Sequence, residues 1–386
     1  MNRAPEHLNT GAPEHLSTRT LEHLNTRAPE HLSTGALEHW STAGIIGGLA
    51  MAPLRMAQYG TKHGHAAGKL LALRRNPDVE LVGVCEPDPA RRNELEHAGG
   101  PFQGVRWFED PRALLDDPSI VAVAAEGRND ESLDQVEQIV RAGKHVWYDK
   151  PAGENWEQWQ RVVALARQHG LIIQMGYMFR YHAGFQRIAG WARSGLLGRI
   201  FAVRAHMSTW LPEAARRTIG RHAGGIFYDL AGHMIDQIVW LLGRPARVSA
   251  FLRHDDELAP GFADNTLGVF EYERAMAVID IAAMEPPPPA RRFEVYGDRG
   301  SAIMEPFEPA GPIRLCLAEA RASYRPGEQF IPVPTQPRQQ LYELELAAFL
   351  AAVRGERPPD RTLEHELLVQ ETLLRATGGI PASVVY

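Results

Sequence analysis

The stretch "AGKHVWYDKPAG", residues 142–153, combines a short hydrophobic run with a lysine that stands between an aspartate and a proline. The run "KHVWY" (144–148) is typical of a strand, and Lys150 follows it almost directly. Pro151 restricts the backbone of the lysine before it. By itself this pattern fits either a solvated lysine at a strand end or a lysine held in a functional position, so the neighbouring segments have to decide.

Apolar strand-like runs and helical runs alternate on both sides of this stretch. The predicted strands cover residues 54–60, 79–88, 120–125, 144–148 and 171–179, and the predicted helices cover 65–76, 88–98, 130–143 and 156–170. Asp88 is a candidate N-cap, with Pro89 in the first turn. Largely apolar strands indicate burial on both faces, and their alternation with helices predicts a doubly wound parallel sheet, an α/β domain of the Rossmann type.

Such a sheet binds its ligand at the carboxyl ends of its strands. The turn after the first strand, "GTKHGHAAG" (60–68), keeps the first glycine of a G-x-G-x-x-G pattern as Gly60 but has Lys62 and His65 at the other two positions. Lys62 is either a charge contact to a phosphate or a solvated loop lysine. The candidate cofactor contacts in this turn are Gly60, Thr61, Lys62 and His63.

Glu86 stands at the end of the second predicted strand. An acidic side chain there accepts hydrogen bonds from the ribose hydroxyls of an adenosine, and it repels a ribose phosphate. We therefore expect NAD as the cofactor, with NADP less favoured. Arg91 and Arg92 are close enough in sequence to weaken that preference.

After residue 180 the pattern changes to that of an antiparallel sheet. The predicted strands cover residues 199–207, 246–254, 265–273, 275–283, 291–297 and 301–306, and two predicted helices cover 339–355 and 363–378. The sequence thus predicts an α+β second domain with a large, mostly antiparallel open sheet. The expected boundaries are a repeat leader at 1–50, a dinucleotide-binding domain at 51–175, and a domain for substrate binding and oligomerisation at 176–386.

A further helix, predicted for "GGIFYDLAGHMIDQIVWLLG" (224–243), carries candidate catalytic side chains. Asp229 and His233 are four residues apart, so they lie on one face, one turn from each other. A solvated polar face would give the same pattern. The two glycines before the helix and the pairing of a histidine with an aspartate favour a functional site.

Together these segments resemble the Gfo/Idh/MocA family of NAD(P)-dependent oxidoreductases over residues 54–378. The matching motifs are "YDKP" (148–151), where the family commonly has Glu-Lys-Pro, "GGIFYDLAGHMID" (224–236), where it has two glycines and an Asp-x-x-x-His helix, and "YGDRGSAI" (296–303). The departures are Lys62 in the glycine loop and "EGRND" (126–130), where a Thr-Pro-Asn loop is common.

The resemblance implies roles for individual residues. Lys150 would lie beside the nicotinamide in the cleft between the domains and stabilise negative charge that develops on the substrate oxygen. His233 would be the general base during oxidation, and Asp229 would orient its imidazole or bind a neighbouring hydroxyl. Asn129 would be a further cofactor contact. Hydride passes directly to the nicotinamide, so no metal is required.

The predicted wall of the substrate pocket comes from residues 177–182, Trp210 and residues 216–222. Its aromatic members, Tyr177, Tyr181 and Trp210, would pack against the C–H face of a sugar. Its basic members, Arg180, Arg217 and His222, would bind hydroxyls or a carboxylate. Core aromatics and a solvated basic loop are the alternative. The family suggests a sugar, cyclitol or related polyol as the substrate.

Two other functions fit the same motifs. The first is an NAD-dependent glycosidase, which oxidises a sugar carbon transiently, eliminates the aglycone and returns the hydride. It uses the same lysine and histidine, so the motifs do not separate it from a dehydrogenase. The second is a non-catalytic ligand sensor, and the presence of Lys150, Asp229 and His233 together argues against it.

Composition sets further limits on function. Of the 386 residues, 44% are hydrophobic and 23% are charged, as in ordinary globular proteins. A net charge of −6 argues against a nucleic-acid partner. No stretch reaches the ~18 apolar residues of a membrane span. The chain has only two cysteines, which do not form a disulfide framework, so we expect a reducing compartment, the cytoplasm. An uncovered sheet face in the second domain predicts a homodimer or homotetramer.

The first fifty residues contain a repeat with a period of eight, such as "APEHLNTG" (4–11). The repeat unit is too short and too polar to bury a core, and prolines interrupt it. It therefore predicts a disordered leader. Its regularly spaced histidines are His7, His15, His23, His31 and His39. A metal-binding tract here, or a metal on His63 and His65, is the less favoured reading, and we expect no metal site.

Overall fold

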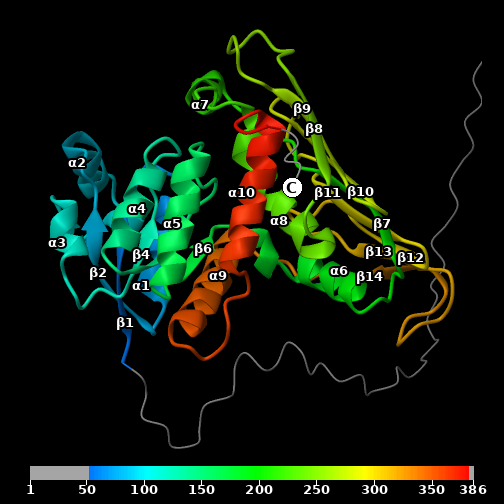
Figure 1. Ribbon diagram of the computed structural model, residues 1–386, viewed down its shortest axis with the longest axis horizontal. Helices are drawn as coiled ribbons and strands as arrows, with labels where there is room; N and C mark the ends of the chain where they lie inside the picture. Colours follow the sequence, from blue (N-terminus) through cyan, green and yellow to red (C-terminus); the bar gives the residue numbers. More distant parts are fainter. Residues whose placement is uncertain (1–51, 382–386) are drawn as a thin grey trace, which may run out of the picture. The chain divides into compact units, whose positions relative to one another are not determined.

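The computed structural model describes residues 52–381 of the chain. The predicted leader with its repeated histidines lies outside the described residues, as do residues 382–386. The described part contains two β-sheets, one in each predicted half (Figure 1), while the exact domain boundaries stay a prediction. Between residues 52 and 381, every helix is too short or too polar to cross a membrane.

The first sheet has six parallel strands in the order β3-β2-β1-β4-β5-β6. They are β1 (Leu54–Tyr59), β2 (Val79–Cys85), β3 (Trp107–Phe108), β4 (Ala122–Ala125), β5 (His145–Tyr148) and β6 (Ile173–Met175). The helices between them are α1 (Ala66–Arg75), α2 (Pro89–Ala98), α3 (Pro111–Leu115), α4 (Ser132–Arg141) and α5 (Trp156–Gln168). This confirms the Rossmann prediction, and the order reverses between β1 and β4, where such sheets bind their ligands.

Local sequence signals account for several of these boundaries. Asp88 caps α2, because its side chain accepts hydrogen bonds from the N–H groups of Ala90 (3.0 Å) and Arg91 (3.3 Å), as predicted. The predicted strand at 171–179 is shorter in the structure. At Gly176 a Cβ atom would lie only 2.7 Å from Oδ1 of Asp149, and the chain leaves the sheet for the 3₁₀ segment Met178–Tyr181.

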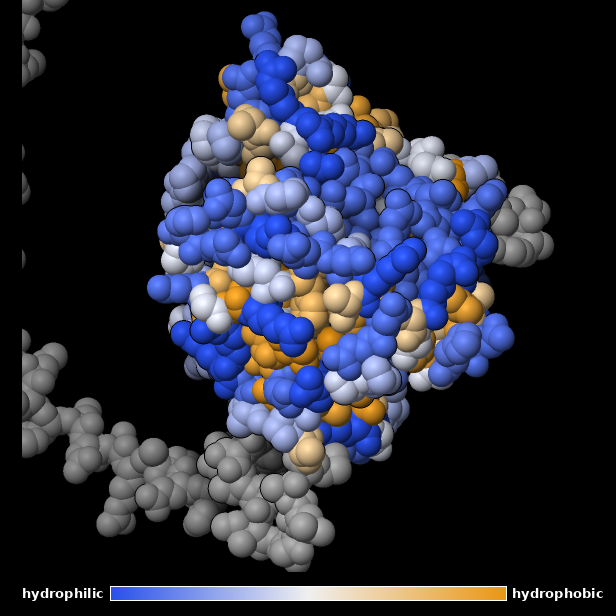
Figure 2. All heavy atoms as spheres, turned by 90° about the vertical axis from the view of Figure 1, so that its left-hand side faces the viewer, coloured by the Kyte–Doolittle hydropathy of each residue, from blue (hydrophilic) through white to orange (hydrophobic). Residues whose placement is uncertain are grey.

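The apolar side chains of the first sheet are inside the protein. Val123, Val146 and Trp147 have no exposed surface. Figure 2 shows mainly hydrophilic residues, with a smaller hydrophobic area, on the face that is at the left of Figure 1. Burial of the strands on both faces explains why their sequences read as continuous apolar runs.

The second sheet has eight strands in the order β14-β13-β12-β11-β7-β10-β9-β8. They are β7 (Ile200–His206), β8 (Arg247–Arg253), β9 (Asn265–Glu271), β10 (Met276–Ala282), β11 (Arg292–Gly297), β12 (Gly300–Met304), β13 (Ile313–Leu317) and β14 (Gly327–Ile331). Only β7 and β10 pair in parallel, so the sheet is mostly antiparallel, as predicted. Helices α6 (Ala183–Arg193) and α8 (Ile226–Leu242) lie on one side of it (Figure 1).

The last two helices, α9 (Arg338–Val353) and α10 (Leu363–Thr377), return to the first half of the chain. Nε2 of Gln339 on α9 donates to the carbonyl oxygen of Gly68 on α1 (3.1 Å). On α10, Gln370 accepts from the N–H of Ala152 (3.1 Å) and donates to the carbonyl oxygen of Gly153 (2.6 Å). These bonds fix the segment that follows Lys150 and hold it near the second half.

Candidate active site

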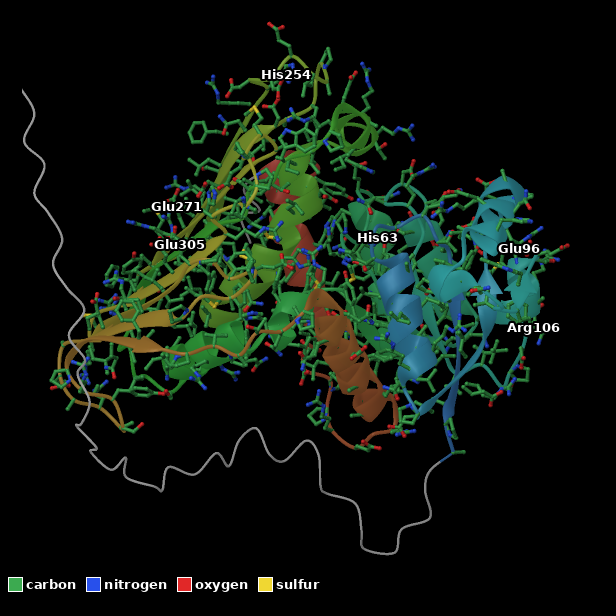
Figure 3. The ribbon with its side chains drawn as sticks, turned by 180° about the vertical axis from the view of Figure 1, so that it is seen from behind. His63, Glu96, Arg106, His254, Glu271 and Glu305 are labelled. Atoms are coloured by element: carbon green, nitrogen blue, oxygen red, sulfur yellow. The ribbon has the colours of Figure 1, made fainter. Side chains whose placement is uncertain are left out.

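Four strands of the first sheet end in residues that meet at one edge. Gly60 follows β1, Glu86 follows β2, Glu126 follows β4 and Asp149 follows β5. Parallel strands share their carboxyl edge, so these residues come together there. His63 also lies at this edge, where the first half meets the second (Figure 3).

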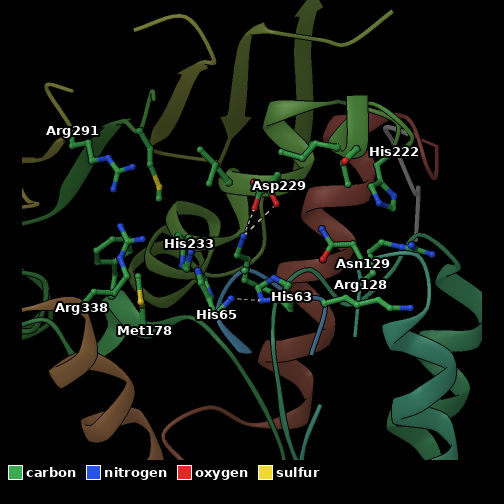
Figure 4. Close-up of a pocket in the computed structure, with 18 residues that line it drawn as sticks. His63, His65, Arg128, Asn129, Met178, His222, Asp229, His233, Arg291 and Arg338 are labelled. Atoms are coloured by element: carbon green, nitrogen blue, oxygen red, sulfur yellow. Dashed lines mark hydrogen bonds and ion pairs between the residues drawn. The ribbon is translucent and has the colours of Figure 1, made fainter. Parts of the chain in front are cut away.

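A cavity of about 280 Å³ opens at this junction (Figure 4). The predicted site residues that line it are Lys62, His63, Asn129, Lys150, His222, Asp229 and His233. Met178, Phe179 and Met207 add an apolar part to the wall. The structure therefore brings the lysine of one half and the histidine of the other into one cavity.

The turn after β1 fits a dinucleotide although it lacks two of the usual glycines. Gly60 has a φ of 87°, and a Cβ atom there would lie 2.4 Å from the nitrogen of Gly127 and 2.7 Å from the carbonyl carbon of Glu126. Only glycine fits this position. The N–H of His63 donates to the carbonyl oxygen of Glu126 (3.0 Å). The turns after β1 and β4 are thus joined at the point where a pyrophosphate binds in such folds.

Lys69, Glu126 and Asp149 form a buried ionic cluster beneath this turn. Nζ of Lys69 lies 3.2 Å from Oε1 of Glu126 and 3.2 Å from Oδ2 of Asp149. Burial raises the pKa of Glu126, although Lys69 counteracts this. Burial also acts to raise the pKa of Asp149. The nearby His63, His65 and Lys69 outweigh this effect and hold the pKa of Asp149 well below its usual range. The cluster keeps a charged aspartate directly before Lys150.

His63 and His65 extend this cluster to the cavity. Nδ1 of His65 lies 3.0 Å from Oδ2 of Asp149, and Nδ1 of His63 lies 3.4 Å from the same oxygen. Burial lowers the pKa of His65 to about 4, although Asp149 opposes this. Burial also acts to lower the pKa of His63, but Asp149 outweighs it and the pKa is raised. The donor atoms lie within 4.8 Å of one another, and Lys69 already contacts the shared carboxylate, so the expectation of no metal stays a prediction.

Lys150 connects the two halves. Its Nζ donates to the main-chain oxygen of Asp229 on α8 (2.7 Å) and lies 3.5 Å from Oδ1 of the same residue (Figure 4). Its N–H donates to Oδ1 of Asp149 (2.7 Å). The side chain is only 4% exposed and lines the cavity. It is therefore a held lysine in a cleft, and the alternative of a solvated strand-end lysine is excluded.

His233 lies on α8, one turn after Asp229, and is buried. Its ring packs against Phe179 with centroids 5.1 Å apart. Within residues 52–381, its Nδ1 has no hydrogen-bond partner, and Asp229 contacts Lys150 rather than this imidazole. Burial and the charge of Lys150 lower the pKa of His233 well below its usual value. The imidazole is therefore neutral near pH 7 and able to accept a proton.

Lys62 and Glu86 both have protein partners at the nucleotide end. Nζ of Lys62 lies 3.3 Å from Oδ2 of Asp88. Glu86 is buried and accepts hydrogen bonds from Oγ1 of Thr61 (2.6 Å) and the N–H of Asp88 (3.0 Å). A second cavity of about 530 Å³ is lined by Lys62, Asp88, Ala90, Arg91, Glu94 and Arg128. Both signs of charge line this cavity, and the role of Glu86 in the preference for NAD over NADP stays a prediction.

Five residues that the sequence placed in the substrate pocket do not line the cavity: Tyr177, Arg180, Tyr181, Trp210 and Arg217. Arg217 is exposed and pairs with Glu213 on its own helix. Arg180 is buried, with Nε 3.0 Å from Oδ2 of Asp236 and its guanidinium 4.0 Å from the ring of Trp240. Tyr177 belongs to the core, and Trp210 is 53% exposed. The short 3₁₀ segment turns most of these side chains inward, where they stabilise the fold instead of lining the cavity.

Arg291 and Arg338 line the cavity but were not predicted as site residues. Arg291 precedes β11, and Arg338 is the first residue of α9. Each is a basic residue at the end of an ordinary element, without a motif around it. The packing of α9 against α1 and the 3₁₀ segment Met178–Tyr181 brings Arg338 to the site, and Arg291 pairs with the same carboxylate as Arg338, that of Glu308.

Two family models match the chain. Residues 44–177 match the oxidoreductase family with an NAD-binding Rossmann fold, and residues 185–303 match the GFO/IDH/MocA C-terminal domain. Together they cover more than half of the chain. The chain therefore belongs to the Gfo/Idh/MocA family of NAD-binding oxidoreductases, as its motifs predict.

Curated relatives extend this finding. The chain is 28% identical to the uncharacterized oxidoreductase YdgJ of Escherichia coli over 60% of its own length and 66% of that protein's length. It is 26% identical to 1,5-anhydro-D-fructose reductase of Ensifer adhaerens over 74% of its own length and 84% of that protein's length. It is also 26% identical to scyllo-inositol 2-dehydrogenase (NAD(+)) of Bacillus subtilis over 77% of its own length and 86% of that protein's length.

Solved structures share the fold. The structure of a levoglucosan dehydrogenase in complex with NADH and levoglucosan aligns with a TM-score of 0.72 at 18% sequence identity. The alignment covers 84% of this chain and 97% of that one. Both sheets therefore belong to one known two-domain architecture.

Proposed function

We propose that the protein transfers a hydride between a hydroxyl-bearing carbon of a sugar or polyol and the nicotinamide of NAD. The observation that carries this proposal is the pair formed by Lys150 and His233. One is a buried cation and the other a buried neutral base, and both line the same cavity at the carboxyl edge of a dinucleotide-binding sheet. The names of two relatives, a reductase of an anhydrofructose and a dehydrogenase of an inositol, support the substrate class.

In the oxidation direction His233 takes the proton of the substrate hydroxyl. Burial and the charge of Lys150 lower the pKa of His233 and keep it unprotonated, which is the form that can accept a proton. Lys150 donates a hydrogen bond to the same oxygen and stabilises its negative charge as the C–O bond gains double-bond character. Bound NAD supplies the acceptor for the hydride. Asp229 holds the ammonium group in place through its main-chain oxygen.

The test is a search for NADH formation by the purified protein. Candidate sugars, polyols and glycosides are added with NAD, and absorbance at the NADH band is followed beside chromatography of the products. Accumulation of NADH with an oxidised product supports the proposal. Release of an aglycone without accumulation of NADH would instead indicate the redox glycosidase. Binding without either reaction would indicate a sensor.

The outer face of the second sheet supports a further proposal, a homodimer or homotetramer. Helices cover one side of this sheet in the described part of the chain (Figure 1). Phe251 on β8, Met276 on β10 and Phe330 on β14 are 62%, 50% and 60% exposed. Large apolar side chains in contact with water across a broad sheet favour burial against a second copy.

A further inference from the structure

The cavity wall carries an excess of positive charge. Five of its residues have a permanently charged basic side chain, Lys62, Arg128, Lys150, Arg291 and Arg338, and one has a carboxylate, Asp229. A neutral sugar and the nicotinamide ring would not balance this excess. Charged groups in a partly dehydrated cavity need a counter-charge, because burial of unpaired charge is costly.

These five side chains fall into separate groups. Lys62 and Arg128 also line the second cavity at the nucleotide end and have carboxylate partners there. Lys150 is held by Asp229. Arg291 and Arg338 lie together at the opposite end of the site from Arg128, beyond His233 (Figure 4). Their positive charge therefore faces the substrate end of the cavity and not the nucleotide end.

Arg291 and Arg338 share one carboxylate. Oε1 of Glu308 accepts from Nε (3.0 Å) and Nη2 (2.8 Å) of Arg338, and Oε2 of Glu308 pairs with Nη1 of Arg291. Glu308 itself does not line the cavity. The side chain of Arg291 is 11% exposed, and its Nε lacks a hydrogen-bond partner among the described residues. Two guanidinium groups and one carboxylate leave a single net positive charge and unused donors.

We propose that the substrate is a sugar acid or polyol acid whose carboxylate binds Arg291 and Arg338 while its reacting hydroxyl lies between Lys150 and His233. This inference rests on the proposed function and names the substrate class of that site. The planar guanidinium fork matches a carboxylate with two parallel hydrogen bonds. A single net positive charge is neutralised by one carboxylate, whereas a phosphate dianion would leave an excess of negative charge.

The test measures binding to the NADH-loaded protein by calorimetry with matched pairs of ligands. The pairs are D-glucose with D-glucuronate and D-galactose with D-galacturonate, and D-glucose 6-phosphate is the phosphate probe. Each acid is expected to bind at least about tenfold more tightly than its neutral partner, the usual effect of a charge-assisted hydrogen bond. Arg291→Gln and Arg338→Gln should each remove most of that difference.

Two further variants sharpen the test. Glu308→Gln keeps the shape of the side chain but removes the competing charge, so it should increase the preference for the acids. Arg314→Gln is the control, because Arg314 on β13 is, like Arg338, a half-exposed, ion-paired arginine, and it does not line the cavity. It should leave the preference unchanged.

Several outcomes would overturn the proposal. These are equal binding of acid and neutral sugar, preference for the phosphate, absence of binding by every acid at millimolar concentration, and an acid preference that survives in both arginine variants. The proposed function fails separately. Acids that bind through Arg291 and Arg338 without forming NADH would refute the dehydrogenase and leave the carboxylate site standing. NADH formation from neutral sugars alone would support the dehydrogenase and refute the carboxylate site.

Discussion

Nζ of Lys150 lies 2.7 Å from the main-chain oxygen of Asp229, so the end of β5 and the helix α8 meet in one hydrogen bond. This bond crosses from one half of the protein to the other. It fixes an ammonium group within the cavity while Oδ1 of Asp229 lies 3.5 Å away as a counter-charge. The lysine is therefore positioned before any substrate binds, which is the condition for electrostatic stabilisation of a transition state.

Lys150→Met should reduce turnover by about 10²–10³ and leave the dissociation constant of NAD near its wild-type value. The methionine keeps the apolar stem but cannot donate a hydrogen bond to the substrate oxygen. Steady-state kinetics and nucleotide titration measure the two effects. Lys144→Met is the control, since Lys144 precedes the same strand and is also buried, but its Nζ bonds to the oxygens of Asp117 and Ile120. An equal loss of turnover in the Lys144→Met control would show that the loss is not specific to Lys150 and would contradict its catalytic role.

His233→Ala should lower turnover by ~10²–10⁴, the usual contribution of a positioned general base. The pH profile supplies an independent readout. Oxidation needs the neutral imidazole, whose pKa is lowered well below 6.5, so the wild-type rate should stay level through pH 6.5 and fall only in more acidic solution. The variant should lack this acid limb. A variant that keeps both the limb and a tenth of the activity would exclude His233, and His222 would be the next candidate.

The same depressed pKa affects stability. Below pH 6.5 the unfolded chain binds a proton at His233 more readily than the folded protein does. The contribution of this residue to the free energy of unfolding should therefore be lost as pH falls from 6.5 toward the folded-state pKa. A denaturant titration of wild type and His233→Asn should show a smaller loss in the variant over this range.

The parts of this site that the sequence could predict are those with a local pattern. Lys150 is marked by a strand and a proline, and His233 by its spacing from Asp229 on a helix. Arg180 was misplaced because its partner Asp236 comes from a distant element, and no pattern near Arg180 indicates that ion pair. Arg291 and Arg338 were missed for the same reason. The same limit applies to the fold. The strand β14, "GEQFI" (327–331), was not predicted, because it lacks a clear apolar alternation.

NAD should bind more tightly than NADP, because the carboxylate of Glu86 at the end of β2 repels a ribose phosphate. Glu86→Gln should narrow the ratio of the two dissociation constants by about fivefold, the effect of ~1 kcal/mol between two charges about 4 Å apart in water. Fluorescence titration with NADH and NADPH measures both constants. Glu94→Gln is the control, because this exposed carboxylate lines the second cavity and pairs with Arg91. Preference for NADP in the wild type would contradict the assignment.

Removal of metal ions should not change the activity. His63, His65 and Asp149 have the spacing of metal ligands, but the ammonium of Lys69 lies 3.2 Å from the carboxylate oxygen that they share. That cation already supplies the positive charge. Dialysis against a chelator, followed by NADH assays with and without added zinc or manganese, checks this. Loss of activity that one metal restores would show that the histidines bind it.

The exposed face of the second sheet should hold two copies of the chain together. Light scattering at micromolar concentration is expected to give the mass of a dimer or tetramer. Phe251→Glu places a charge on β8, at a position that is 62% exposed in a single chain, and should shift the mass toward the monomer because burial of that charge in an interface is costly. Leu258→Glu, in the loop after β8 and 42% exposed, is the matched control and should keep the wild-type mass. A monomeric wild type, or a shift in the control equal to that in Phe251→Glu, would show that this face does not form the interface.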